Sequence, residues 1–205
     1  MPDFRYEDAA RAAGHGLICG VDEAGRGPWA GPVVAGAVIL DRATLPLDLA
    51  DGLDDSKKLK PARRRELLGQ LQGVAVIGVG IADVVEIDDL NILQATMLAM
   101  TRAVEGLSDI PDMALIDGNR APKIGCATQC VVKGDAKSLS IAAASIVAKV
   151  TRDKIMTDLA GAFPGYGWEH NAGYGTKEHQ GALALLGVTP EHRRSYAPIR
   201  KILGV

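Results

Sequence analysis

Residues 17–40 read LICGVDEAGRGPWAGPVVAGAVIL, and this stretch decides the fold class. An apolar run at 17–21 and a second at 33–40, rich in β-branched residues, flank a segment of acids, glycines and prolines. β-Branched residues favour strands, whereas glycine and proline mark turns. The stretch therefore predicts two strands joined by a Gly/Pro turn, with Asp22 and Glu23 at the end of the first strand.

The pattern that follows this stretch changes from strands alone to strands mixed with helices. Pro61 marks the start of a helix at 62–71, and VAVIGVGIA at 74–82 predicts a third strand, which indicates an antiparallel meander. The further predictions are an amphipathic helix at 87–104, a buried strand at 113–116, a strand near 128–132, a helix of small and apolar residues at 139–150, and a short helix around 178–186. This order predicts a mixed β-sheet flanked by α-helices, an α/β fold.

Composition limits the classes of protein to consider. The chain has 205 residues, 47% of them hydrophobic, and a formal net charge of −2, so a polyanionic partner needs local basic patches or metal ions. The charged start and the short apolar runs predict neither an export signal nor a membrane segment. Cys19, Cys126 and Cys130 form neither an even disulfide set nor a zinc signature, so we expect reduced, packed thiols in a cytoplasmic protein.

Three apolar runs stop at carboxylates. LICGV is followed by Asp22 and Glu23, MALI by Asp117, and TQCVVKG by Asp135. Strand ends are where α/β sheets build their sites, and carboxylates gathered there repel one another unless cations share them. Carboxylate oxygens select Mg²⁺ or Mn²⁺. Four carboxylates that hold two such ions form the usual site for phosphodiester hydrolysis. The alternative is that these acids only cap turns, as Asp before Gly commonly does.

Two groups of basic residues and the later histidines carry weaker signals. Phosphate contacts are the natural use of the basic groups, and a solvated helix face and tail are the alternative. His170, His179 and His192 show no metal-ligand spacing and are interpreted as structural or peripheral. The basic groups are Lys57, Lys58, Lys60 and Arg63, Arg64, Arg65 in one, and Arg193, Arg194, Arg200 and Lys201 in the other.

The string DEAGRGP at 22–28, with AGPVV at 30–34, closely resembles the opening motif of the ribonuclease HII family. The resemblance covers all but about the first dozen residues and the last few. It continues in the family's order through DSKKL at 55–59, IDGN at 116–119, KGDAKS at 133–138, AKVTRD at 148–153, FPGYG at 163–167, GYGT at 173–176 and HRRS at 192–195.

The resemblance assigns roles to matching residues. It implies that Asp22, Glu23, Asp117 and Asp135 are the acidic catalytic and metal-binding residues. It also implies that Gly25, Arg26 and Gly27 form a substrate loop whose main chain contacts the ribose 2′-OH, that Tyr174 packs on the neighbouring sugar, and that Lys57 binds substrate. Glycines let backbone approach a sugar closely, and the 2′-OH is what distinguishes RNA from DNA. From the residues alone, GRGP is equally well a tight turn, and an isolated loop tyrosine such as Tyr174 is more often a packing residue than a ligand contact.

The sequence departs from the family pattern at one place. Many relatives carry His-Lys before the Gly-Tyr-Gly element, where this chain has Asn171 and Ala172. A charge that contacts the nucleic-acid backbone is then missing, which leaves the substrate affinity open.

The resemblance implies a ribonuclease H-like fold with a small helical C-terminal element. We expect a single catalytic domain over residues 1–205, with about 188–205 as a C-terminal appendage, acting as a monomer. The implied reaction is hydrolysis of the RNA strand of RNA/DNA hybrids and cleavage 5′ of single ribonucleotides in duplex DNA, with Mg²⁺ or Mn²⁺ in a two-metal site. Ribonucleotide excision repair and primer removal in DNA replication follow by analogy.

Two other functions remain open on the sequence. One is another two-metal nuclease or integrase of the same fold that acts on DNA, which would not need the GRG loop or Tyr174. The other is a nucleic-acid-binding module without catalysis, which would have no reason to keep all four acids together.

Overall fold

A mixed β-sheet forms the centre of the computed structural model, which describes residues 1–53 and 59–205. Within these residues five strands pair in the order β3-β2-β1-β4-β5. β1, β2 and β3 are antiparallel neighbours, whereas β1, β4 and β5 run parallel. The predicted meander and mixed sheet are therefore confirmed. The strands are β1 (Ile18–Ala24), β2 (Val33–Leu40), β3 (Ala75–Ala82), β4 (Met113–Asp117) and β5 (Ala127–Val131).

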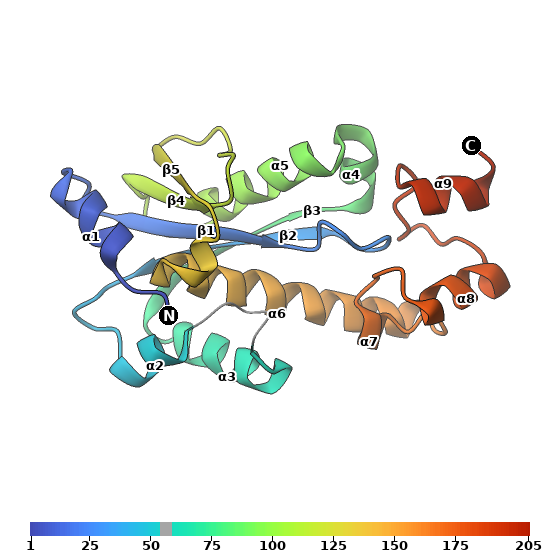
Figure 1. Ribbon diagram of the computed structural model, residues 1–205, viewed down its shortest axis with the longest axis horizontal. Helices are drawn as coiled ribbons and strands as arrows, with labels where there is room; N and C mark the ends of the chain where they lie inside the picture. The colour runs from blue at the N-terminus through green and yellow to red at the C-terminus, as the bar shows by residue number, and fades with distance from the viewer. Residues whose placement is uncertain (54–58) are drawn as a thin grey trace.

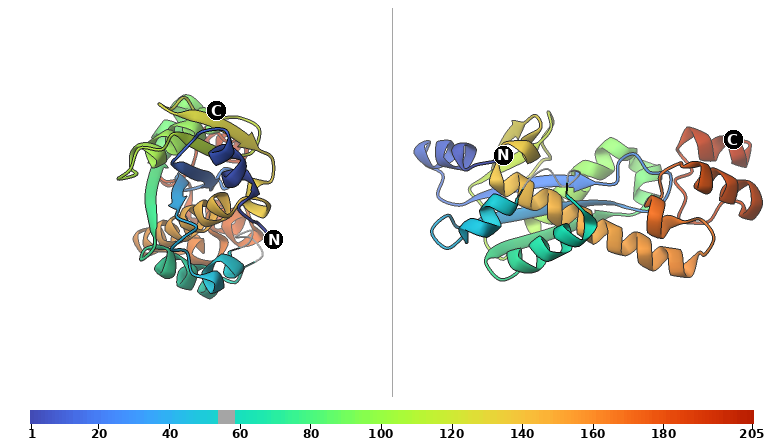
Figure 2. Two further views of the ribbon diagram at one scale, coloured as in Figure 1. Left: turned by 90° about the vertical axis from the view of Figure 1, so that its left-hand side faces the viewer. Right: turned by 60° about the horizontal axis from the view of Figure 1, so that its bottom comes forward.

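Helices cover both faces of this sheet. Figure 1 shows α4 and α5 on one face, and α6 on the other with α2 and α3 beyond it, while α7, α8 and α9 gather at one end of an elongated molecule. Figure 2 shows the same layers from two further directions. The helices are α1 (Arg5–Ala12), α2 (Leu47–Gly52), α3 (Pro61–Leu71), α4 (Val84–Leu90), α5 (Ile92–Glu105), the 3-10 turn η1 (Gly134–Ala136), α6 (Leu139–Ala162), α7 (Trp168–Asn171), α8 (Lys177–Leu186) and α9 (Ala197–Leu203).

Small residues let α6 lie directly on the sheet. A Cβ atom at Gly20 would come 2.1 Å from the carbonyl carbon of Ser140, and one at Gly36 would come 2.6 Å from the carbonyl oxygen of Ala144. Residues 139–148 of α6 are all buried, as predicted from their composition. This close contact brings the middle of α6 beside the end of β1, where Asp22 and Glu23 lie.

The residues predicted as a helix at 87–104 are helical except at Asn91, but the prediction of one continuous helix was wrong, because the structure has two helices there. Asn91, with φ of 70°, separates α4 from α5. Asparagine tolerates this left-handed region, and its Oδ1 accepts the N–H groups of Leu93 (3.0 Å) and Gln94 (3.2 Å), which caps α5. Asp83 and Glu86 form a capping box that starts α4.

Two other expectations needed correction. The helix predicted at 139–150 continues to Ala162, because its second half is amphipathic and carries the ion pairs Lys149–Asp153 and Lys154–Asp158 one turn apart. Cys19 is a buried thiol as expected, but Cys130 is exposed on β5, which is an edge strand.

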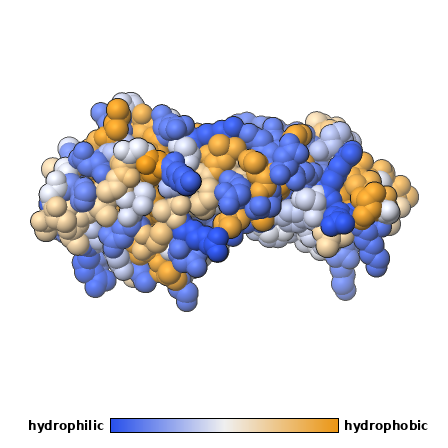
Figure 3. All heavy atoms as spheres, turned by 90° about the horizontal axis from the view of Figure 1, so that it is seen from above, coloured by the Kyte–Doolittle hydropathy of each residue, from blue (hydrophilic) through white to orange (hydrophobic). Residues whose placement is uncertain are grey.

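The surface mixes polar and apolar side chains. Figure 3 views the molecule from the side of α4 and α5, where hydrophilic residues are interspersed with hydrophobic ones. None of the helices in the described part of the chain combines the length and hydrophobicity that a membrane span requires.

Candidate active site

Asp22 and Asp117 lie side by side on the two central parallel strands. The register of β1 and β4 pairs Gly20 with Leu115 and Val21 with Ile116, so Asp22 and Asp117 are the next matched positions. Because side chains alternate along a strand and matched positions share a face, both carboxylates point to the same side of the sheet. The prediction that these strand-end acids lie close together is confirmed.

Asp135 reaches the same place from η1, the turn that follows β5. Lys133 adopts a left-handed conformation with φ of 57°, which turns the chain back toward the sheet. The N–H of Gly134 then donates to Oδ1 of Asp117 at 2.6 Å. Asp135 is buried next to this bond, so the third strand-end acid is tied to the second by the backbone of its own loop.

The acidic residues influence one another strongly. Burial raises the pKa of Asp22 well above its ordinary value, and the charges of Glu23, Asp117 and Asp135 raise it further. Burial also raises the pKa of Glu23, although Arg26 opposes this with a 3.2 Å ion pair between Nη1 and Oε1. The structure thus brings together all four predicted acids in one cluster of excess negative charge.

The cluster has the chemistry of a divalent-metal site. Its donors are carboxylate oxygens, the ligands that Mg²⁺ and Mn²⁺ prefer. A bound cation would offset the repulsion between the negative charges of these acids. No three His, Cys, Asp or Glu side chains within residues 1–53 and 59–205 are arranged to hold an ion as they stand. Oxygens of Asp22 and Asp117 instead accept backbone N–H groups, from Glu23 at 2.7 Å and Gly134 at 2.6 Å. The donor set therefore fits a metal, and metal binding requires these side chains to turn.

A cavity of about 260 Å³ opens beside Asp22 and Glu23. The predicted substrate loop, Gly25, Arg26 and Gly27, lines it together with Tyr174. A second cavity of about 290 Å³ shares Glu23 and Arg26 and adds Asp117 and residues 118–120. Sequence reasoning missed three residues that α6 contributes to the first cavity. They are Ser145, Lys149 and Arg152.

Tyr174 is held at the rim of the first cavity by the turn before it. The residue is 49% exposed, and a Cβ atom at Gly27 would lie 3.3 Å from Cε1 of its ring. Asn171 is buried and bridges this turn, because its Nδ2 donates to the carbonyl of Tyr166 at 2.8 Å and its Oδ1 accepts the N–H of Gly173 at 2.9 Å. Asn171 thus shapes the turn that presents Tyr174.

The sequence predicted two groups of surface basic residues, but the structure buries some of their members. Arg193 is wholly buried, so its interpretation as a phosphate contact or a solvated tail residue was wrong. Arg64, also expected on a surface patch, is buried beside α6, where it pairs with Asp153 at 3.4 Å. Sequence alone does not separate a buried arginine from an exposed one. Lys57, the predicted substrate contact, lies outside the described residues, as does Lys58.

The histidines agree with their structural interpretation. His179 and His192 are buried in an aromatic cluster with Tyr166 and Trp168, and the Nε2 atoms of the two histidines are 3.0 Å apart. The side chain of His170 is 76% exposed.

Comparison with known proteins gives consistent matches over almost the whole chain. The family model described as Ribonuclease HII matches residues 19–199. A ribonuclease HII of Parvibaculum lavamentivorans is 59% identical over 204 residues, which are 99% of this chain and 74% of that protein.

Solved structures share the fold. The ribonuclease H2 of Pyrococcus horikoshii OT3 superposes with a TM-score of 0.76 at 28% identity, over 91% of this chain and 97% of that one. The Bst ribonuclease HIII in complex with Mn²⁺ superposes with a TM-score of 0.77 at 21% identity, over 96% of this chain and 72% of that one. The ribonuclease H-like α/β fold is confirmed, and the chain belongs to the ribonuclease HII family, whose members are endoribonucleases that act on RNA in RNA/DNA hybrids.

Proposed function

We propose that this ribonuclease HII hydrolyses the RNA strand of RNA/DNA hybrids and cuts on the 5′ side of single ribonucleotides in duplex DNA, leaving 3′-hydroxyl and 5′-phosphate ends. The observation that carries the proposal is that Asp22 and Glu23 line one cavity with the loop Gly25-Arg26-Gly27 and with Tyr174. The acids that would hold the catalytic metal ions and the residues that would contact a sugar can therefore reach the same nucleotide.

We infer that Asp22, Glu23, Asp117 and Asp135 hold Mg²⁺ or Mn²⁺ in a two-metal site. The clustering of their charges and the raised pKa of Asp22 support this assignment. The bound ions would supply an activated water and stabilise the leaving oxygen. The carboxylates' part is to hold the ions at the ends of β1 and β4, where the ions would bind the reacting phosphate.

The exposed loop residues Arg26 and Gly27 are suited to distinguish ribose from deoxyribose. Main-chain groups of this loop would hydrogen-bond the 2′-OH, and Tyr174 would pack against the adjacent sugar. A deoxyribose would leave those polar groups unpaired, which is a strong basis for discrimination. Because the 2′-OH is held by the loop, it is not the nucleophile, and the ends are those of direct hydrolysis.

The competing function is a two-metal nuclease of the same fold that acts on DNA. Mg²⁺- or Mn²⁺-dependent cleavage of a labelled RNA/DNA hybrid, beside all-DNA and all-RNA duplexes of the same sequence, separates the two. We expect cleavage of the hybrid RNA strand alone, with 5′-phosphate ends. Cleavage of the all-DNA duplex at a similar rate would favour the DNA nuclease.

We propose that the enzyme acts as a monomer, because the cavity beside Asp22 and Glu23 is lined by the proposed substrate loop and Tyr174 without a second copy. Because its proposed substrates arise on chromosomal DNA, we propose that it acts in the cytoplasm, in ribonucleotide removal and DNA replication.

A further inference from the structure

Arg193 lies directly behind the substrate loop, where it is 0% exposed. Its five N–H donors are all used. Nη2 donates to the carbonyls of Gly25 (2.6 Å) and Pro32 (3.2 Å), Nε to that of Gly31 (2.9 Å), and Nη1 to that of Arg26 (3.0 Å) and to the Tyr196 hydroxyl (2.9 Å).

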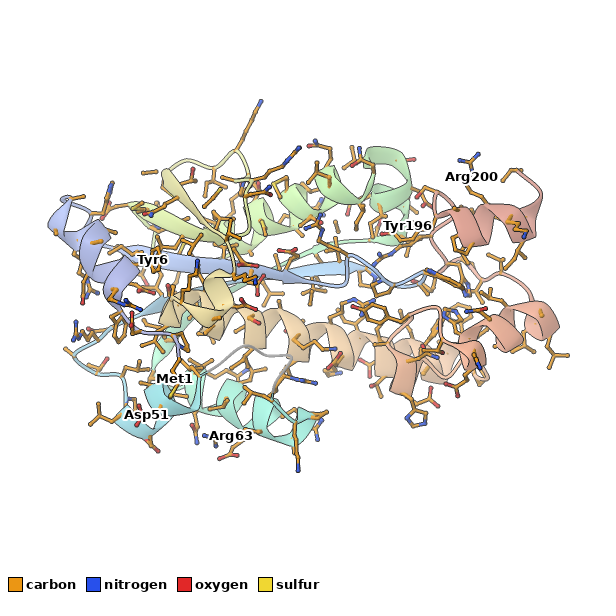
Figure 4. All side chains as sticks on the ribbon, in the orientation of Figure 1. Met1, Tyr6, Asp51, Arg63, Tyr196 and Arg200 are labelled. Carbon is orange, nitrogen blue, oxygen red and sulfur yellow. The ribbon has the colours of Figure 1, made fainter. Side chains whose placement is uncertain are left out.

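Tyr196 completes the contact. Its hydroxyl donates to the carbonyl of Arg26 at 2.5 Å, and the guanidinium of Arg193 lies 5.2 Å from the centre of its ring. Figure 4 shows Tyr196 in the C-terminal element, whereas Arg200 points away from the body of the molecule. A segment near the C-terminus therefore holds a loop that is more than 160 residues away in sequence.

These bonds fix which way the loop amides point. In a trans peptide the N–H is directed opposite to the C=O of the same peptide plane. The carbonyls of Gly25 and Arg26 face Arg193, so the N–H groups of Arg26 and Gly27 face away from it. Arg26 and Gly27 are exposed, and both line the cavity that holds Tyr174.

A second buried arginine braces the same region. Arg152 of α6 donates to the carbonyls of Ala30 (3.1 Å), Pro32 (2.9 Å) and Ala172 (3.0 Å). Gly25, with φ of 100°, leaves room for it, because a Cβ atom there would lie 2.0 Å from Nε of Arg152. The loop thus lies on a rigid support of two guanidinium groups, and its inner carbonyls have fixed partners.

We propose that Arg193 and Tyr196 are positioning residues for ribonucleotide recognition, which hold the 25–26 and 26–27 peptide planes so that the N–H groups of Arg26 and Gly27 donate to the ribose 2′-oxygen. This inference rests on the proposed function. Lysine cannot replace Arg193, because it has three donors on one atom, whereas Arg193 makes five hydrogen bonds from three atoms.

The test measures preference for ribose rather than overall activity. In a cleavage-inactive Asp135→Asn background with Mg²⁺, fluorescence anisotropy gives the Kd of a DNA duplex with one ribonucleotide and of its all-deoxy counterpart. Tyr196→Phe keeps the ring and removes the hydroxyl that donates to Arg26 and accepts from Arg193, so we expect the preference for the ribonucleotide duplex to fall by at least about fivefold, the effect of one hydrogen bond. Arg193→Lys should reduce it further.

Tyr166→Phe is the matched control, because the Tyr166 hydroxyl also donates to a backbone carbonyl, that of Gly187 at 2.9 Å, away from the loop. In the Asp135→Asn background, Tyr166→Phe should leave the preference for the ribonucleotide duplex unchanged. If Tyr196→Phe weakens binding of both duplexes by the same factor, Tyr196 only supports the fold and the inference is overturned. If the Asp135→Asn protein binds the ribonucleotide duplex no better than the all-deoxy duplex, and the active wild-type enzyme cuts neither duplex, the proposed function itself is wrong.

Discussion

The Nε2 atoms of His179 and His192 share a hydrogen bond of 3.0 Å next to the loop that carries Tyr174. Trp168 Nε1–H donates to His179 Nε2 at 3.2 Å, and the N–H of Thr189 donates to His192 Nδ1 at 3.0 Å. Both of these ring nitrogens are therefore acceptors. It follows that His192 donates through Nε2–H to His179, and that His179 donates through Nδ1–H to the carbonyl of Tyr174 at 3.0 Å. Both rings are neutral in this arrangement.

The two histidines should make stability depend on pH. Burial and the neighbouring His179 lower the pKa of His192 from 6.5 to about 4. In the folded protein His192 resists protonation, so its contribution is complete above pH 6.5 and is lost as the pH falls toward 4. Denaturant unfolding of wild type and His192→Gln from pH 7.5 to 4.5 should show that the free-energy difference between them shrinks by about 3 kcal/mol. A difference that does not change with pH would contradict this protonation state.

The exposed histidine provides the control for that experiment. His170→Gln changes the same residue type outside the cluster and should keep the pH dependence of the wild type.

Removing one buried charge should stabilise the metal-free protein. The raised pKa of Asp22 means that burial and the neighbouring acids disfavour its ionised form. In EDTA, Asp22→Asn should therefore raise the free energy of unfolding by about 1 kcal/mol or more, and in a separate assay with Mg²⁺ it should abolish cleavage. Asp51, which is exposed on α2, provides the control (Figure 4), because Asp51→Asn should change neither the stability in EDTA nor the cleavage with Mg²⁺. A destabilised Asp22→Asn protein would indicate that the carboxylate is needed for the fold.

Divalent metal should stabilise the wild type through the same cluster. Binding to the folded state raises the free energy of unfolding by RT ln(1 + [L]/Kd), so Mg²⁺ or Mn²⁺ should raise the melting temperature in proportion to the logarithm of its concentration above Kd. Asp117→Asn should largely remove this shift, whereas Asp51→Asn should keep it. Equal shifts in both variants would place the ion elsewhere.

Tyr174 should act through its ring. Tyr174→Phe should keep most of the activity on a single-ribonucleotide duplex, whereas Tyr174→Ala should lose roughly tenfold or more in kcat/KM, because burial of a large apolar ring against the sugar contributes about 1.5–3 kcal/mol. Steady-state cleavage measures both. An equal loss in the two variants would assign the effect to the hydroxyl instead.

Glu7 connects α1 to the loop that carries Asp135. Its Oε1 accepts the Ser138 hydroxyl (2.6 Å), the Ser140 hydroxyl (2.6 Å) and the Ser140 N–H (3.0 Å). Hydrogen bonds to a charged group contribute about 1.5–3 kcal/mol, so Glu7→Ala should lower the free energy of unfolding by at least that much and reduce cleavage.

Asp8→Ala is the matched control on the same helix. Its exposed ion pair with Arg42 at 2.7 Å contributes at most about 1 kcal/mol, so this variant should retain cleavage. If Asp8→Ala and Glu7→Ala change the free energy of unfolding and the cleavage activity by the same amounts, α1 has no particular role at the Asp135 loop.

The sheet and the acidic cluster could be predicted from the sequence because their signals are local. Each strand is a short apolar run, and Asp22 and Asp117 follow such runs directly, whereas Asp135 follows its run after Lys133 and Gly134. Parallel strands then bring strand ends together without further information. The break at Asn91 was missed because the apolar period continues across it, and only the capping potential of asparagine indicates a second helix.

The supporting residues could not be predicted, because their partners are distant in sequence. Arg193 and Arg152 are polar residues in a tail and a helix, and their burial depends on carbonyls from residues 25–32. α1 was missed because its start is charged and lies outside the recognised motifs. Distant contacts of this kind leave no periodic pattern in the chain.

The most direct test is cleavage of an end-labelled DNA duplex that contains one ribonucleotide, with Mg²⁺ or Mn²⁺, beside an all-DNA duplex and the Asp135→Asn variant. We predict a single cut on the 5′ side of the ribonucleotide, absent from the all-DNA duplex and from the variant. Cutting of the all-DNA duplex, or undiminished cutting by Asp135→Asn, would contradict the account.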